Sequence, residues 1–358
     1  MFIKWLALAG GVGLMSWWFT DRLIRREWLL GSLDHPNDRS LHTLPTPRNG
    51  GIAIQSSFWL GLSMAGGIAM QQKESIAAIV SEWSAMAWIL GLVWPLIIVS
   101  YWDDRKSVPV GIRFGTHMAV ASALVLVNQL ELEKIAIPFW GELSLGHLSV
   151  LVSVVFLVWM TNLYNFMDGM DGFAGGMTVA GGVCLAYFAF VAHEEPMAVV
   201  ALLLAASSFG FLFHNFPPAR IFMGDVGSIP MGFLFGALIL WGCREQVFDL
   251  WVPLIIFSPF LVDATVTLLR RAFRRERIWE AHRTHYYQRV VLLGWGHRQT
   301  VLVEYALMCG CVALAFVYQY GTEWVRAAVV VAWCALLGIL IGGVEWVEGV
   351  PGQRRDVS

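Results

Sequence analysis

The chain has little charge for its 358 residues. Charged residues make up 14% of the sequence, whereas soluble domains carry about a quarter. There is also no cysteine framework, because the five cysteines lie in or beside apolar runs without metal-type spacing. The sequence has no repeat of solenoid period and no low-complexity tract. With 57% hydrophobic residues and a mean hydropathy of +0.63, these absences exclude a soluble domain and indicate a polytopic membrane protein.

Long apolar runs stand where charge is missing. About eleven runs are long enough to cross a bilayer, which takes about 20 apolar residues. We therefore predict an all-α polytopic membrane protein with about eleven transmembrane helices, in which residues 1–358 form one integral membrane domain. The predicted spans are 2–20, 51–70, 84–102, 113–130, 148–164, 172–192, 196–213, 227–243, 249–269, 300–320 and 324–345.

Positive charge is unevenly shared between the two sides of these spans. If the N-terminus lies outside, the outer side holds five basic residues and the inner side the other 19 of the 24. Because basic loops stay in the cytoplasm, we predict a periplasmic N-terminus and a cytoplasmic C-terminus. The polar loops 21–50, 103–112, 162–171, 214–226 and 270–299, and any site they form, then face the cytoplasm. On the outer side, residues 131–147 are predicted to form a small hairpin.

The most informative stretch runs from Asn162 to Gly172 and carries amide or carboxylate side chains at every third position. Steps of three residues drift by about 60° around a helix, so these side chains cannot share one face. Gly169 and Gly172 allow the backbone to open. We predict a helix end that unwinds into a loop and directs four side chains at one pocket; a polar turn between two helices is the alternative. The four are Asn162, Asn165, Asp168 and Asp171.

Two more acidic sites flank apolar runs. The adjacent Asp103 and Asp104 would repel each other unless a divalent cation lies nearby, although neighbouring basic residues could pair with them at the surface. Asp225 lies between two glycines just before the eighth span, where a helix start directs its N–H groups at a ligand. Phe222, close by, could stack on a base or simply pack.

The loop 270–299 is strongly basic. His282, Arg283 and His285 could grip phosphates, while membrane topology and contact with lipid headgroups are the alternative explanation of the charge. Asp263 lies inside the ninth span, where a functional role and a structural pairing are both open. Three acidic and two basic loops on one membrane face form the layout expected for Mg²⁺ and diphosphate chemistry with a lipid partner.

Five motifs, in this order, resemble the polyprenyl-phosphate N-acetylhexosamine-1-phosphate transferase family, also called glycosyltransferase family 4. The resemblance extends from about Asp34 to Arg289. Each motif alone is modest, but the five together are highly specific. They are Pro36–His42 with Pro45–Gly51, Asp103-Asp104, Asn162–Gly172, Phe222–Ser228 and His282–Gln288.

The resemblance implies an enzyme that transfers a sugar 1-phosphate from a UDP-amino sugar to undecaprenyl phosphate and releases UMP. Members require Mg²⁺, with Mn²⁺ as a substitute, and lie in the bacterial inner membrane among lipids, with no nucleic-acid partner. The implied pathway is the first membrane step of O-antigen, lipopolysaccharide or related cell-envelope polysaccharide synthesis. A transporter or flippase is the competing function, although its ionisable groups would lie near the bilayer midplane.

The resemblance also assigns roles to individual residues. Asp103 and Asp104 are implied to bind metal and to position or deprotonate the lipid phosphate, and Phe222 to stack on uracil. The implied metal ligands are Asp225, Asp104 and Asp103. The implied catalytic residues are Asp103, Asp104, Asp168, Asp171, His282, Arg283 and His285. The implied UDP-sugar residues are Asn165, Asp168, Asp171, Phe222 and Arg48.

Two departures from the family pattern bear on the sugar. The last motif lacks the adjacent histidines of the peptidoglycan branch, which argues against a muramoyl-pentapeptide substrate. The Asp103-Asp104 pair is followed by two basic residues instead of a third acid, which favours O-antigen initiators that use deoxy amino sugars. In the eighth span, Gly232 and Gly236 could form a homodimer face or serve internal packing.

Overall fold

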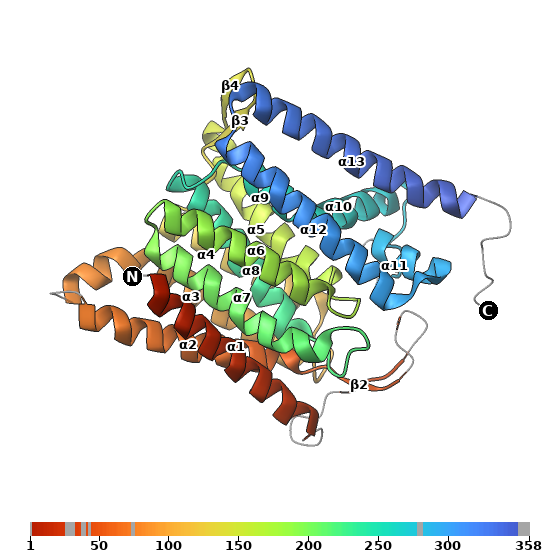
Figure 1. Ribbon diagram of the computed structural model, residues 1–358, viewed down its shortest axis with the longest axis horizontal. Coiled ribbons are helices and arrows are strands. Elements are labelled where there is room, and N and C mark those ends of the chain that lie inside the picture. Colours follow the sequence, from red (N-terminus) through yellow and green to blue (C-terminus); the bar gives the residue numbers. More distant parts are fainter. Residues whose placement is uncertain are drawn as a thin grey trace.

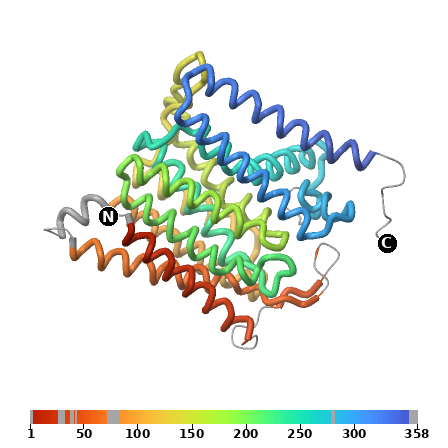
Figure 2. Tube along the Cα trace, viewed as in Figure 1, coloured from red at the N-terminus to blue at the C-terminus, as the bar shows by residue number. Residues whose placement is uncertain are grey.

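A computed structural model describes residues 2–25, 33–36, 41, 44–72, 76–277 and 282–349. Over this part of the chain the protein is a bundle of long helices with two small β-hairpins (Figures 1 and 2). The helices are α1 (Phe2–Arg25), α2 (Gly50–Gln72), α3 (Ile76–Asp103), α4 (Val110–Asn128), α5 (Ser149–Phe166), α6 (Phe173–Val191), α7 (Glu195–Asn215), α8 (Asp225–Arg244), α9 (Trp251–Ile256), α10 (Ser258–Phe273), α11 (Tyr286–Val290), α12 (Gly296–Tyr320) and α13 (Glu323–Gly349). Of the first predicted motif, Asn37, Asp38, Arg39, Ser40 and His42 lie outside the described residues.

Nine helical stretches in the described part are long and apolar enough to cross a membrane, so the chain is a multi-pass membrane protein. The prediction of about eleven spans is too high by this measure. The first predicted span does form a helix, α1, which packs against α2 and α7, but it is not among the nine. Its apolar stretch is diluted by Lys4 and by three glycines.

The predicted span 249–269 is wrong as a single helix. It is divided into α9 and α10, which meet at Phe257. Pro259 lies in the first turn of α10, and proline has no N–H to continue the ladder of the preceding helix. With 6 and 16 residues, neither piece is long enough to span a bilayer alone.

Helix α8 is the centre of the bundle, with 94% of its apolar window buried, whereas α13 at the outer edge has only 11% buried. A Cβ atom at Gly232 would lie 2.4 Å from the carbonyl oxygen of Met160, and one at Gly236 would lie 3.1 Å from Leu157. Both glycines therefore bring α8 close to α5. This pair serves internal packing, and the alternative of a homodimer face does not hold.

Polar segments gather at both ends of the bundle. The hairpin predicted for 131–147 is confirmed, as β3 (Lys134–Ile137) pairs with β4 (Gly141–Ser144). At the opposite end, β1 (Leu33–Asp34) pairs with β2 (Thr46–Pro47) in the first polar loop (Figure 1). The other four predicted polar loops lie at this same end, where their side chains meet.

Candidate active site

Asp104 fastens the start of α8 to the end of α3. Its carboxylate oxygens accept hydrogen bonds from the backbone N–H groups of Asp225 and Val226, each at 3.0 Å. An anion here satisfies two of the N–H groups that a helix start leaves unpaired. The N–H groups of α8, predicted to face a ligand, therefore face Asp104.

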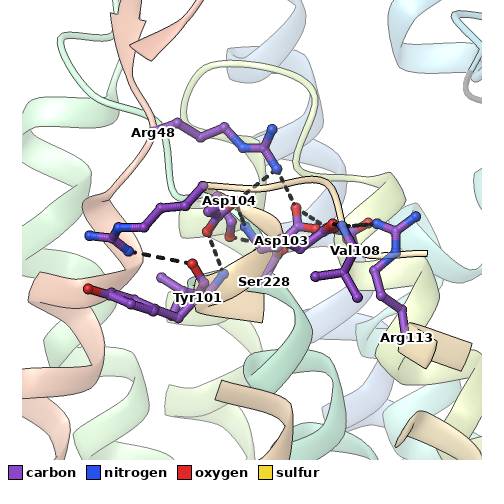
Figure 3. Close-up of polar contacts among 12 residues, drawn as sticks. Arg48, Tyr101, Asp103, Asp104, Val108, Arg113 and Ser228 are labelled. Atoms are coloured by element: carbon purple, nitrogen blue, oxygen red, sulfur yellow. Dashed lines mark hydrogen bonds and ion pairs between the residues drawn. The ribbon is translucent and has the colours of Figure 1, made fainter. Parts of the chain in front are cut away.

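Arg48 bridges two of the predicted acidic residues, and Figure 3 shows its guanidinium group beside Asp104. Its Nη2 atom lies 2.8 Å from Asp104 Oδ1 and 2.8 Å from Asp225 Oδ1. Burial opposes the charge of Arg48, but Asp225 and Asp104 outweigh this effect and raise its pKa above the usual range. Arg48 thus links the first loop to Asp104 and Asp225.

Asp103 faces a second arginine, which the sequence analysis used only for topology. Arg113 Nη1 lies 2.5 Å from Asp103 Oδ2 and 3.7 Å from Asp225 Oδ2, and the N–H of Val108 donates to Asp103 Oδ1 at 2.7 Å (Figure 3). Arg113 is in the first turn of α4. The available signal was the position of Arg113, a basic residue at a helix start soon after the Asp103-Asp104 pair. The short connection between them must bring the arginine back toward Asp103.

The predicted helix end is confirmed, because α5 stops at Phe166 and α6 begins at Phe173. On the last turn of α5, the Asn165 amide donates to Asp225 Oδ1 at 2.9 Å and to Ser228 Oγ at 3.1 Å. Beyond the helix end, Asp168 lies near Asp225, Asp104 and Arg48. Two of the four predicted polar side chains therefore join the same cluster.

The other two polar side chains of this stretch point elsewhere, so the prediction of one shared pocket is only half right. The Asn162 amide donates to the Val158 carbonyl of its own helix at 2.6 Å. Asp171 accepts a hydrogen bond from the N–H of Ala219 at 2.9 Å and lies 3.0 Å from His297 Nδ1. His297 was not singled out in the sequence analysis.

The acidic residues are too close for their charges to be independent. The carboxyl groups of Asp103 and Asp225 are in hydrogen-bond contact, and only 8% and 10% of these side chains is exposed. Burial, together with the charges of Asp225 and Asp104, raises the pKa of Asp168 well above its usual range, although part of its side chain stays accessible. Burial also raises the pKa of Asp104, against the opposing effect of Arg48. The cluster has more negative than positive charge.

This donor set fits Mg²⁺ chemically. Magnesium prefers carboxylate oxygens and commonly shares its shell with substrate phosphates. Two carboxylates in contact, Asp103 and Asp225, are stabilised by a cation that neutralises them. Asp104 is committed to the start of α8 and to Arg48. Among the residues that the structure describes, no three His, Cys, Asp or Glu side chains form a complete metal-binding group.

Close backbone contacts hold Asp225 in place. The N–H groups of Gly50 and Gly51 donate to the carbonyls of Phe222 and Met223 at 2.9 and 2.7 Å. A Cβ atom at Gly51 would lie 2.3 Å from the backbone nitrogen of Gly227. Gly51 and Gly227 thus allow a close approach of α2 to α8. Phe222 is fixed through its backbone and keeps a partly exposed ring.

The histidine motif surrounds Asp263. The Asp263 carboxylate accepts hydrogen bonds from the N–H groups of Tyr286 and Tyr287 and from the Thr267 hydroxyl, at 2.9, 3.0 and 3.1 Å. His285 Nδ1 lies 3.1 Å from the same carboxylate, and the residue is 3% exposed. The alternatives for Asp263 were a functional role and a structural pairing, and these contacts form a structural pairing. His285 is part of it and presents almost no surface to a ligand.

His282 and Arg283 are the more accessible members of this motif, since both are only partly buried. Burial lowers the pKa of His282 to about 4, and its ring centroid lies 4.8 Å from that of His285. The motif packs beside the acidic cluster, because the Tyr287 hydroxyl donates to the Phe166 carbonyl at 3.2 Å. Of the predicted phosphate-gripping group, His282 and Arg283 therefore lie on its open side.

Comparisons with known proteins identify the family of this chain. Residues 86–243 match the family described as Glycosyl transferase family 4. A probable undecaprenyl-phosphate N-acetylglucosaminyl 1-phosphate transferase of Bacillus subtilis (strain 168) is 30% identical over 304 residues, which cover 84% of this chain and 81% of the relative. A decaprenyl-phosphate N-acetylglucosaminephosphotransferase of Mycolicibacterium smegmatis is 29% identical over 339 residues, or 87% and 81% of the two chains.

A relative from the peptidoglycan branch matches over a shorter stretch. The phospho-N-acetylmuramoyl-pentapeptide-transferase of Thermotoga neapolitana is 31% identical over 193 residues, which cover 52% of this chain and 59% of the relative. The long matches are thus to N-acetylglucosamine transferases. The chain belongs to glycosyltransferase family 4, the polyprenyl-phosphate N-acetylhexosamine-1-phosphate transferases, and is a polyprenyl-phosphate sugar-1-phosphate transferase.

Proposed function

We propose that the protein transfers N-acetylglucosamine 1-phosphate from UDP-N-acetylglucosamine to undecaprenyl phosphate and releases UMP. The observation that carries this proposal is the buried cluster of Asp103, Asp104, Asp168 and Asp225, which in the described part of the chain faces Arg48 and Arg113. Such a cluster suits a cation-bound diphosphate. The names of the long matches support N-acetylglucosamine as the sugar.

In the proposed reaction, an oxygen of undecaprenyl phosphate attacks the β-phosphorus of the UDP-sugar. The bond from the β-phosphorus to the bridging oxygen breaks, and UMP leaves with that oxygen. A phosphate monoester has a second pKa of about 6, so the nucleophile is mostly deprotonated at neutral pH. No strong general base is needed, and Asp103, held by Arg113, serves to align the attacking phosphate.

Asp225 and Asp103 would hold Mg²⁺, with Asp168 beside them. When bound, the ion offsets charge on the diphosphate and on the departing UMP. Asp104 fixes Asp225 by holding the start of α8. Arg48 bridges Asp104 and Asp225 and is proposed to face the donor phosphates. Asn165 and Phe222 are proposed to face the nucleoside, and His282 and Arg283 the sugar phosphate. Asp171, whose carboxylate contacts Ala219 and His297, would support the nucleoside side through its loop.

We further propose that this end of the bundle faces the cytoplasm of a bacterium, with a periplasmic N-terminus and a cytoplasmic C-terminus. The uneven share of lysine and arginine supports this orientation. The reaction would then be the first membrane step in building a cell-envelope polysaccharide, with O-antigen and lipopolysaccharide as the predicted pathways.

The decisive experiment is UMP release by the purified protein with undecaprenyl phosphate and Mg²⁺, across a panel of UDP-N-acetyl sugars that includes the deoxy amino sugars. We expect release with UDP-N-acetylglucosamine and its loss in Asp225→Asn. Release only with a deoxy amino sugar would overturn the proposed donor. Activity that survives in Asp225→Asn would overturn the metal assignment but keep the reaction class.

A chiral thiophosphate analogue of the donor tests the single displacement. One in-line attack inverts the configuration at phosphorus, whereas a two-step route through an aspartyl-phosphate retains it. We expect inversion, and retention would require a covalent intermediate on one of the aspartates.

A further inference from the structure

The loop between α5 and α6 is held at its far end by contacts that the proposed reaction does not use. The N–H of Gly172 donates to Asn215 Oδ1 at 2.9 Å, and the Tyr305 hydroxyl donates to the Gly172 carbonyl at 2.7 Å. The N–H of Ala219 donates to Asp171 Oδ2 at 2.9 Å. Helix α7, the 217–220 turn and helix α12 therefore all hold residues 171 and 172.

One face of α12 makes the contacts from that helix. His297, Val301 and Tyr305 follow each other at four-residue spacing, which places them along one side of a helix. A Cβ atom at Gly172 would lie 3.0 Å from the Tyr305 hydroxyl and 3.5 Å from Val301. This face thus packs tightly on the loop, and His297 is its member nearest the polar end.

His297 contributes the contact of this face with a carboxylate. Its Nδ1 atom lies 3.0 Å from Asp171 Oδ1, and the two side chains are only 19% and 11% exposed. The Nδ1 atom is buried, so its polar contact with the Asp171 carboxylate is shielded from solvent. The ring also contacts the backbone of Leu41 in the first loop.

We propose that His297 is a positioning residue: through Asp171 it fixes the loop 167–172 and thereby the carboxylate of Asp168 in the acidic cluster. The inference rests on the proposed role of Asp168 in the transfer reaction. Asp168 lies three residues before Asp171 in the same short connection between α5 and α6. A shift of the Asp171 end would therefore move Asp168 relative to Asp225.

The test compares UMP release by His297→Ala, His297→Asn, Asp171→Asn and the double variant His297→Ala/Asp171→Asn. The Asn side chain places its Nδ2 atom where Nδ1 of histidine stands. We expect His297→Ala to lower kcat/KM by about 10- to 100-fold, the usual effect of losing a residue that orients a site residue, and His297→Asn to recover most of it. The double variant should be no slower than Asp171→Asn alone.

His147, exposed in the turn Gly146–Leu148 at the opposite end of the bundle, provides the matched control. His147→Ala should behave as wild type. Full activity in His297→Ala would overturn the inference, as would losses in His297→Ala and Asp171→Asn that multiply in the double variant. If His297→Ala does not fold, an inactive but folded His297→Asn, with the thermal midpoint of wild type, would overturn it too. Absence of UMP release in wild type would instead contradict the proposed function.

Discussion

Two acidic sites lie side by side in this protein, and they differ in how well they are satisfied. Asp263 is a single carboxylate that accepts hydrogen bonds from two backbone N–H groups and a hydroxyl and also contacts His285. The acidic cluster holds four carboxylates against Arg48 and Arg113, with Asp103 and Asp225 in direct contact. The first site is complete, whereas the second has a surplus of negative charge.

The carboxylates of the two sites have different roles: Asp263 stabilises the fold, whereas the acidic cluster is proposed to bind a cation or substrate. A buried carboxylate with several donors stabilises the structure, because each lost bond would leave a donor unpaired. Buried carboxylates that face each other destabilise the folded protein, and a bound cation or substrate relieves their repulsion. The sequence left Asp263 open between a functional role and a structural pairing, whereas in the structure the cluster brings several carboxylates together.

The sharpest test of this comparison is Asp168→Asn. The change removes one negative charge from the cluster while keeping the size of the side chain. We expect kcat/KM for UMP release to fall by about a hundredfold, because a residue beside the proposed Mg²⁺ site helps to hold the ion that offsets charge on the diphosphate. The thermal midpoint should stay the same or rise, because like-charge repulsion is relieved. A clear fall in the thermal midpoint would place Asp168 with the structural carboxylates.

Asp263→Asn is the matching change in the satisfied site, and it should act on stability first. The new amide turns an N–H donor toward backbone groups that are themselves donors, so Asp263→Asn should lower the unfolding free energy by about 3 kcal/mol. Thermal unfolding in detergent measures this directly. The activity that remains per folded molecule should stay close to wild type. Loss of activity with an unchanged thermal midpoint would contradict a purely structural role.

Much of the cluster could be predicted from residue types and spacing. Glycines in Asn162–Gly172 indicated the end of α5, and Asn165 and Asp168 do reach Asp225. The direction of each side chain could not be predicted, because it depends on neighbours distant in sequence. Asp171 turns to His297, and Asp104 turns to the start of α8. The sequence pattern contains neither pairing.

The membrane helices show the same limit. Hydropathy predicted most of the long helices, but it did not report the break at Phe257, although Pro259 was the available signal. It also treated α8 and α13 alike, and only packing distinguishes a helix that is 94% buried from one that is 11% buried. Burial is a property of the assembled bundle, so an apolar run alone cannot define it.

Gly224→Ala tests whether the cluster depends on an exact backbone. Gly224 has φ 73° and ψ 173°, a conformation essentially restricted to glycine, and a Cβ atom there would lie 2.6 Å from the Arg48 carbonyl oxygen. We expect a loss of about 1–3 kcal/mol in unfolding free energy, together with reduced UMP release. Gly67→Ala is the control. Gly67 is an exposed residue in a helix, and a Cβ atom there would have no neighbour within 4 Å. Equal effects of the two changes would contradict the special role of Gly224.

The smallest expected effect is the pH dependence that His282 gives to the histidine motif. Burial lowers its pKa in the folded protein to about 4, from an ordinary value of 6.5. Between these two values the unfolded chain binds more protons, so stability should decrease as pH falls from 6.5 toward 4. The effect is reduced by solvent, since His282 is only partly buried. Thermal midpoints of wild type and His282→Gln, compared at mildly acidic and neutral pH, measure it. If His282→Gln loses as much stability in acid as wild type does, groups other than His282 cause the acid sensitivity.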